Sequence, residues 1–135
     1  MLKKTIKFTD FNGTERTETH YFHLSKSELM RKEMSVEGGF SEKIQKISEK
    51  MDAPAIMEVF EDLIRLSYGE KSDDGRRFIK SKELSEAFMQ TGAYDALYME
   101  LITDAEAAAA FFKGVIPDDL AKEVDKANHP ALKSK

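Results

Sequence analysis

The residues best suited to metal chemistry in this chain are two histidines that stand three positions apart, His20 and His23. A structural zinc site takes about four ligands, drawn from histidine, cysteine and carboxylate side chains. The segment around the pair has the alternating pattern of a β-strand, on which residues three apart point to opposite faces. No third ligand stands nearby, and His129 lies alone beside Pro130. The spacing therefore does not predict a metal site.

Two adjacent carboxylates, Asp73 and Asp74, come next, because two close carboxyl groups can divide the roles of acid and base. They precede Gly75, which readily adopts positive φ, and Arg76 and Arg77, which offer counter-charges. Neighbouring turn residues rarely converge on one substrate, so we interpret the segment as a structural turn with exposed charges. The sequence also lacks a calcium loop, a phosphate-binding loop and a nucleophile elbow. We expect no enzyme activity and no cofactor.

The composition is that of a soluble protein. Of the 135 residues, 41% are hydrophobic and 34% are charged, and the net charge is −4. That length suffices for one domain with its own core, and the mild acidity weighs against nucleic-acid binding. The chain has no cysteine, no apolar run of about 18 residues that would span a membrane, and no signal-peptide pattern. We expect a cytosolic protein with neither nucleic acid nor membrane among its partners.

Residues 1–24 are predicted to form a β-hairpin. The first residues alternate between polar side chains and β-branched or aromatic ones. Asn12 and Gly13 supply the turn, and the return strand continues to about Phe22. The first half of that strand, residues 14–19, is so polar that we expect a solvated face or an edge position.

Residues 25–117 are predicted to be helical, with boundaries marked by capping signals. Ser25 and Glu28 form a capping box that opens a helix to about Met34. The segment 67–81 is the charged turn between two helices. A second helix is predicted over 41–51, and a third begins at the N-cap Asp52 and is closed by Gly69. Ser81 is the N-cap of the next helix, which is interrupted at Thr91 and Gly92. Thr103 and Glu106 form a capping box that opens a helix over 104–113, and Gly114 and Pro117 stop it.

These elements predict an α+β domain that is mostly α, with a short N-terminal β-hairpin followed by a compact bundle of five or six short helices. We expect this single globular domain to span residues 1–117. Residues 118–135 balance acids against bases and contain Pro130, so we expect a flexible or marginally helical tail there.

Two apolar features fit partner binding as well as internal packing. Methionines recur in the predicted helices, and methionine suits adaptable binding surfaces as well as irregular cores. Phe111 and Phe112 follow four alanines, and adjacent residues on a helix point about 100° apart. Both rings are therefore buried only if two surfaces are covered. A single broad core is one interpretation, and a core plus a partner or second copy is the other.

Four stretches, taken in order, resemble the tail assembly chaperones of long-tailed phages (siphophages) and of prophages of Gram-positive bacteria. They are Asp10–Met30, Glu37–Ile47, Ser67–Ser81 and Asp104–Pro117. The resemblance covers residues 1–117 and includes no active-site motif. It implies a non-catalytic assembly factor that binds and solubilises the tape measure protein and helps to recruit tail tube subunits. Such a protein acts in the host bacterial cytoplasm and is absent from the mature virion.

On this resemblance, the chaperone would cover apolar helical segments of the tape measure protein by helix-in-groove contact. We expect Met89, Tyr94, Tyr98, Phe111 and Phe112 to contribute to that surface, and self-association is a further expectation. Two other classes stay open. One is a structural head–tail or tail component that is present in the virion, and the other is a regulatory protein that acts on host factors.

Overall fold

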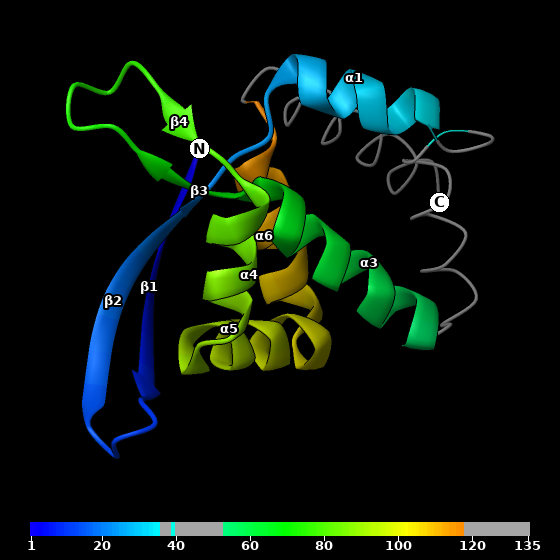
Figure 1. Cartoon of the computed structure of the whole chain (residues 1–135). Coiled ribbons are helices and arrows are strands. Elements are labelled where there is room, and N and C mark those ends of the chain that lie inside the picture. Colours follow the sequence, from blue (N-terminus) through cyan, green and yellow to red (C-terminus); the bar gives the residue numbers. More distant parts are fainter. Residues whose placement is uncertain (36–38, 40–52, 118–135) are drawn as a thin grey trace.

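A computed structural model describes residues 1–35, 39 and 53–117, in which a curved β-sheet lies beside a group of helices (Figure 1). The strands are β1 (Leu2–Thr9), β2 (Glu15–Phe22), β3 (Tyr68–Lys71) and β4 (Phe78–Ile79). The helices are α1 (Lys26–Ser35), α3 (Ala53–Ser67), α4 (Lys82–Met89), α5 (Gly92–Thr103) and α6 (Ala105–Val115). The predicted α+β, mostly α fold with an N-terminal hairpin is confirmed. The predictions for residues 41–51, for Asp52 and for residues 118–135 fall outside the described residues.

The turn between β1 and β2 is organised by one carboxylate. One Asp10 carboxylate oxygen accepts the backbone N–H groups of Asn12 and Thr14, both at 2.9 Å. The other oxygen accepts from the Arg16 guanidinium at 2.6 Å. Gly13 has a φ of 82°, which glycine adopts without a steric penalty. The predicted turn at Asn12 and Gly13 is confirmed, and it joins two strands that pair antiparallel over their whole lengths.

The segment predicted as a plain charged turn, residues 67–81, contains a second hairpin. The prediction that Gly69 closes the preceding helix is wrong, because α3 ends at Ser67 and the chain continues into β3. Two residues of β3 pair with the end of β2, where Gly69 lies opposite Tyr21. The resulting sheet has the order β1-β2-β3-β4. The turn within the segment is as predicted, since Gly75 has a φ of 75°.

Two of the predicted helix starts are confirmed by their hydrogen bonds, and the predicted break at Thr91 is the place where α5 begins. At α1, the N–H of Ser25 donates to the Glu28 carboxylate at 2.8 Å, and the N–H of Glu28 donates to the Ser25 hydroxyl at 3.2 Å. These two bonds are the reciprocal pair of a capping box. Ser81 caps α4 by accepting the N–H of Leu84 at 3.0 Å, and the Thr91 hydroxyl oxygen accepts a backbone N–H at the start of α5.

The predicted capping box at the start of α6 is wrong. The N-cap is Asp104, whose carboxylate accepts the N–H groups of Glu106 and Ala107. Thr103 instead ends α5, where its hydroxyl donates to the carbonyl of Met99 at 2.6 Å. Both residue types are good N-caps, but a carboxylate at this position also interacts favourably with the helix dipole. α6 continues to Val115 and so passes through the predicted stop at Gly114.

The core lies where the end of β2 meets the helices. Phe22 is fully buried, and its ring makes edge-on contacts with aromatic rings from a strand and two helices. These rings are Tyr68 of β3 at 5.7 Å, Phe88 of α4 at 5.7 Å and Phe111 of α6 at 5.3 Å. Such aromatic pairs contribute about 0.5–1.5 kcal/mol each beyond the burial of their area. The same cluster therefore joins the sheet to α4 and α6.

We predict that Gly69→Ala destabilises the fold by about 1–3 kcal/mol, as overpacking does. A Cβ on Gly69 would lie 2.6 Å from the Phe78 ring and 2.8 Å from the backbone oxygen of Ile79, so β3 and β4 would have to separate. Urea unfolding followed by circular dichroism measures the effect. The control is Glu70→Ala at the next, exposed position, which should change the unfolding free energy by less than about 0.5 kcal/mol. Equal stability of the two variants would contradict the account.

Candidate functional site

The five residues predicted to bind a partner separate into two environments. Tyr94, Tyr98 and Met89 are half-buried on α5 and at the end of α4. Phe111 is only 3% exposed and belongs to the core, so its ring has no free face for a partner. Phe112 is half-buried and packs against the same core. Of the five candidates from sequence, Phe111 alone is buried, and the other four are half-buried; the two tyrosines and Met89 lie together near α3 and are considered next.

The two tyrosines form a continuous aromatic surface along α5. Tyr94 and Tyr98 are one helical turn apart, and their ring centroids lie 5.6 Å from each other. The hydroxyl of Tyr98 donates to the backbone oxygen of Met57 on α3 at 3.1 Å. Phe88 of the core supports the Tyr94 ring from below at 6.1 Å, edge-on. The pair is therefore fixed both to the core and to the neighbouring helix α3.

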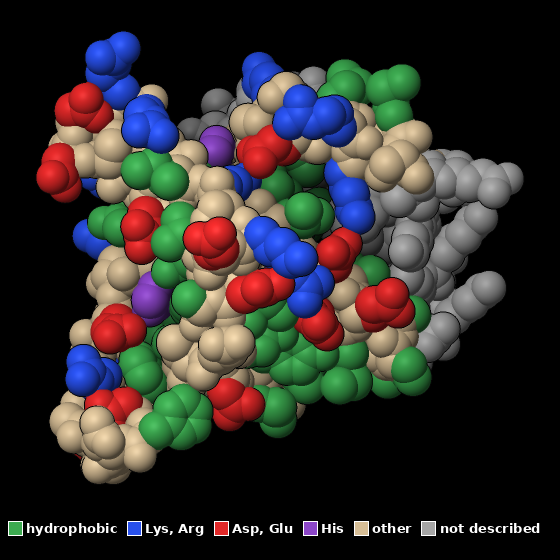
Figure 2. Space-filling view, viewed as in Figure 1, with side chains coloured by type: hydrophobic (Ala, Val, Ile, Leu, Met, Phe, Trp, Pro, Cys, Tyr) green, Lys and Arg blue, Asp and Glu red, His purple; other side chains and the backbone are tan. Residues whose placement is uncertain are grey.

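The α3 side of this surface combines an apolar side chain with an ion pair. The Met57 side chain is 41% exposed. One turn later, Glu61 accepts from the Arg65 guanidinium at 3.2 Å. We name this surface the tyrosine face, defined by Met57, Glu61 and Arg65 of α3 with Tyr94 and Tyr98 of α5. Figure 2 shows hydrophobic side chains gathered over α5 and the lower end of α3, with acidic and basic side chains beside them.

Met89 lies at the border of the tyrosine face. The hydroxyl of Ser85, one turn earlier on α4, donates to the backbone oxygen of Arg65 at 2.9 Å. Residues four apart share one side of a helix, so Met89 lies on the side of α4 that faces α3. Methionine is unbranched and adapts to varied apolar shapes. The arrangement of aromatic and methionine side chains beside an ion pair suits a partner helix with one apolar stripe.

Burial and a nearby charge keep the two phenols neutral. Burial raises the pKa of Tyr94 from 10.0 to about 12, and the negative charge of Glu61 adds to the rise. Burial, followed by the charge of Glu61, also raises the pKa of Tyr98. At neutral pH both side chains are therefore uncharged hydrogen-bonding groups on an apolar surface. Neither phenol is therefore prepared for proton transfer near neutral pH.

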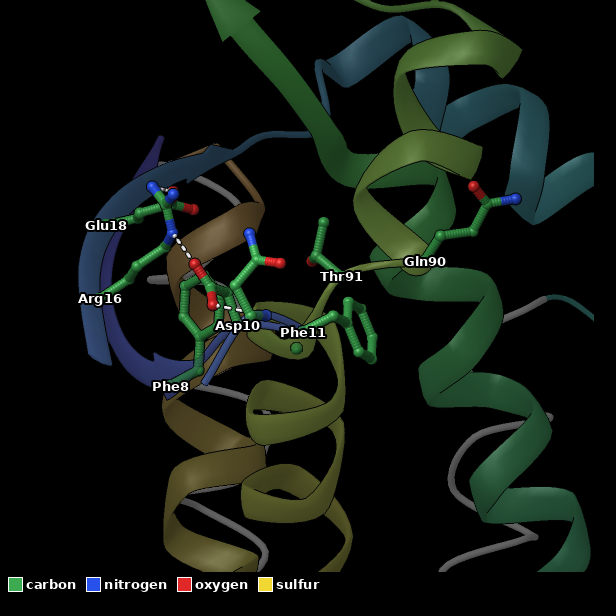
Figure 3. Close-up of a pocket in the computed structure, with 9 residues that line it drawn as sticks. Phe8, Asp10, Phe11, Arg16, Glu18, Gln90 and Thr91 are labelled. Atoms are coloured by element: carbon green, nitrogen blue, oxygen red, sulfur yellow. Dashed lines mark hydrogen bonds and ion pairs between the residues drawn. The ribbon is translucent and has the colours of Figure 1, made fainter. Parts of the chain in front are cut away.

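A second candidate is an open pocket of about 320 Å³ between the β1–β2 turn and the start of α5 (Figure 3). We name it the hairpin-tip pocket. Its wall contains Phe8, Asp10, Phe11, Asn12, Arg16, Glu18, Gln90, Thr91 and Gly92. The hydrogen bond from Arg16, followed by that from the N–H of Thr14, lowers the pKa of Asp10, so this carboxylate stays ionised and bound to its own turn. The pocket therefore offers a place for an apolar side chain and no reactive group.

Phe11 is the residue at this pocket that sequence reasoning missed. It is 88% exposed at the tip of the hairpin, although phenylalanine is usually buried. The rigid turn around Asp10 holds it there. The sequence feature that could have revealed Phe11 is its position inside a turn, between Asp10 and Asn12, where no neighbouring element could cover its ring.

The candidates for metal and acid–base chemistry have structural roles. His20 packs on the Phe88 ring at 4.8 Å, whereas His23 faces Phe78 at 6.0 Å, so the two histidines contact different neighbours. The Asp74 carboxylate accepts from the Ser72 hydroxyl at 2.7 Å and from the N–H of the residue two positions on at 3.0 Å. Within the described residues, no three histidine or carboxylate side chains converge on a position for a metal ion. None of the described helices has the length and apolar character needed to cross a bilayer.

Comparison with known proteins identifies a family. A family model with the description phage tail assembly chaperone matches residues 1–135, the whole chain. No curated protein and no solved structure matches the sequence.

We predict that Tyr94 makes the protein lose stability at alkaline pH. The pKa of Tyr94 in the folded protein is raised from 10.0 to about 12. Its contribution is therefore complete below pH 10 and is lost as the pH rises to about 12. Tyr94→Phe should reduce the fall in unfolding free energy across this interval, measured by urea unfolding at several pH values. At about pH 7 the two proteins should differ only by a constant offset. The same alkaline slope in both proteins would contradict the assignment.

Proposed function

Since the chain belongs to the phage tail assembly chaperone family, we propose that it binds the tape measure protein and keeps it soluble while the tail is built. The surface that we assign to this binding is the tyrosine face. The observation that carries the assignment is an exposed Met57 beside two half-buried tyrosines, on two helices joined by the Tyr98 hydrogen bond. On this proposal the partner presents apolar helical segments, and a chaperone for such segments needs an adaptable apolar surface.

The proposed contact is a helix of the tape measure protein laid against α3 and α5. Its apolar stripe would cover Met57 and the tyrosine rings, and its polar side chains would meet the Glu61–Arg65 ion pair. Full burial of one large apolar side chain contributes about 1.5–3 kcal/mol. A few such contacts per copy produce a complex that forms readily and can still be released when the tail tube closes around the tape measure protein.

The proposed activity is binding alone. On the described surfaces, the carboxylates of Asp10, Asp74 and Asp104 are engaged in turns and a helix cap. We therefore assign no catalytic residue and no cofactor. Recruitment of tail tube subunits is a second part of the proposal, and the hairpin-tip pocket with Phe11 is available for that contact because it is separate from the tyrosine face.

We also propose that the protein acts in the host cytoplasm and leaves the particle before the tail is complete. The alternative is a structural head–tail or tail component. Quantitative mass spectrometry of purified virions and of infected-cell lysate separates the two. The proposal expects the chain in the lysate and at most trace amounts in virions. A fixed number of copies in every virion would establish the structural alternative instead.

We predict that Met57→Glu weakens binding to the tape measure protein by at least about tenfold, because a buried carboxylate without a partner costs several kcal/mol. The measurement is co-expression of both proteins, followed by the soluble fraction of the tape measure protein and its co-purification. The matched control is Met30→Glu, the same substitution at a methionine that is 61% exposed on α1. Circular dichroism must show that both variants are folded.

Two results would remove the assignment. If both variants solubilised the tape measure protein as well as the parent does, the tyrosine face would not be the binding surface. If the parent chain failed to solubilise it at all, the proposed function itself would be wrong.

A further inference from the structure

The outer edge of β1 presents unpaired backbone groups in the part of the chain that the structure describes. β1 is the first strand of the sheet and pairs only with β2. At the turn, the N–H of Asp10 donates to the carbonyl of Thr14. In an antiparallel pair of strands, residue pairs that are hydrogen-bonded to each other alternate with pairs that are not. Because Asp10 and Thr14 are a bonded pair, the N–H and C=O groups of every second residue of β1, counted from Thr9, point away from β2. These outward residues, which we name the β1 edge, are Lys3, Thr5, Lys7 and Thr9.

The same four residues have exposed side chains on the outer face of the hairpin. The close approach of the Thr5 and Thr19 hydroxyls, 3.0 Å apart, agrees with a pair whose backbone groups point outward, because such pairs lie closer together. The β1 edge therefore offers outward backbone donors and acceptors at Lys3, Thr5 and Lys7, whereas the carbonyl oxygen of Thr9 lies close to Gly92 of α5. Two exposed ammonium groups, those of Lys3 and Lys7, are spaced i and i+4 along it.

A hollow lies beside this edge, on its inner side. Its volume is about 280 Å³, and it is bounded by residues 4–7 of β1 and by α5. Ile6 and Leu97 are buried beneath it, Ala96 of α5 adds a small apolar contact, and most of its exposed lining is polar. Lys4 and Glu100 close one end through an ion pair of 2.8 Å. A strand added at the β1 edge would point its alternate side chains into this hollow.

We propose that the β1 edge binds an extended acidic segment of a partner protein, which adds a strand to the sheet. The free backbone groups supply the hydrogen bonds of β-augmentation. Two acidic side chains at positions i and i+4 of the segment would lie opposite Lys7 and Lys3, and opposite charges across a strand pair are stabilising. Between them, one small side chain, at i+1 opposite Ile6, would enter the hollow.

The lysines also exclude a competing occupant. Lysine on an edge strand discourages strands of the same kind from pairing there. Two copies of β1 joined by a two-fold axis would bring their lysines close together, which is unfavourable. The charge pattern therefore selects an acidic strand over a second copy of this edge. This site is separate from the tyrosine face, so it does not depend on the proposed binding to that face.

The test uses a synthetic peptide of about nine residues, the length of a typical strand or slightly more. It carries glutamates at i and i+4, valine at i+1, the inward position opposite Ile6, and threonine elsewhere. Fluorescence anisotropy measures its binding to the full chain at low salt, and NMR follows the amides of Thr5 and Lys7. One control peptide has lysine in place of both glutamates. Another keeps the glutamates but has N-methylated amides at the positions that would bond to β1.

The glutamate peptide should shift both amides, and both control peptides should bind at least about tenfold more weakly. The protein variant Lys3→Glu/Lys7→Glu should show a similar loss, whereas Lys82→Glu, a charge reversal at an exposed position of α4, should leave binding unchanged. Equal binding of the N-methylated peptide would show charge attraction without strand pairing and would overturn the proposal. Absence of binding by the glutamate peptide would also overturn the proposal. If a higher protein concentration alone protected the two amides, a second copy would occupy the edge, which would overturn it as well. Met57→Glu should keep peptide binding, so failure here and failure at the tyrosine face are distinguishable.

Discussion

The burial of Phe22 is the constraint on which the arrangement depends. This ring ends β2, is fully buried, and touches rings from β3, α4 and α6. Because side chains alternate along a strand, an inward Phe22 also turns His20 and Glu18 inward and leaves Thr19 and Thr17 on the outer face. One packed side chain thus fixes which face of the whole hairpin meets the helices and which face meets solvent.

Two different surfaces follow from that constraint. On the helical side, Phe88 contacts Phe22 and also supports Tyr94, so the tyrosine face is held against the core. On the strand side, the long β1–β2 hairpin extends past the helices (Figure 1). Phe11 lies at its tip, and exposed lysines lie along its outer edge. A protein that must bind one partner and present it to another can use two such surfaces, because a rigid core keeps them apart.

Local signals predicted the elements that depend on local chemistry. The turn at Gly13 and the caps at Ser25 and Ser81 each rest on hydrogen bonds within a few residues, and the sequence was sufficient for them, whereas at Thr91 it indicated a break but not the cap. β3 was missed because its four residues include Gly69 and two charged side chains, and only pairing with the distant β2 makes it a strand. The burial of Phe111 likewise depends on Phe22, which is far away in sequence. The sequence therefore indicated three half-buried aromatic residues, Tyr94, Tyr98 and Phe112, but could not separate them from the buried Phe111.

The most direct measurement is hydrogen–deuterium exchange on the full chain, alone and mixed with the proposed partner, the tape measure protein. The account predicts that binding slows exchange in the facing turns of α3 and α5, around Met57 and Tyr98, because the tape measure helix covers them. It predicts no comparable change in α1, where Met30 is exposed but lies outside the tyrosine face. Slower exchange confined to α1 or to the hairpin, with α3 and α5 unchanged, would contradict the account.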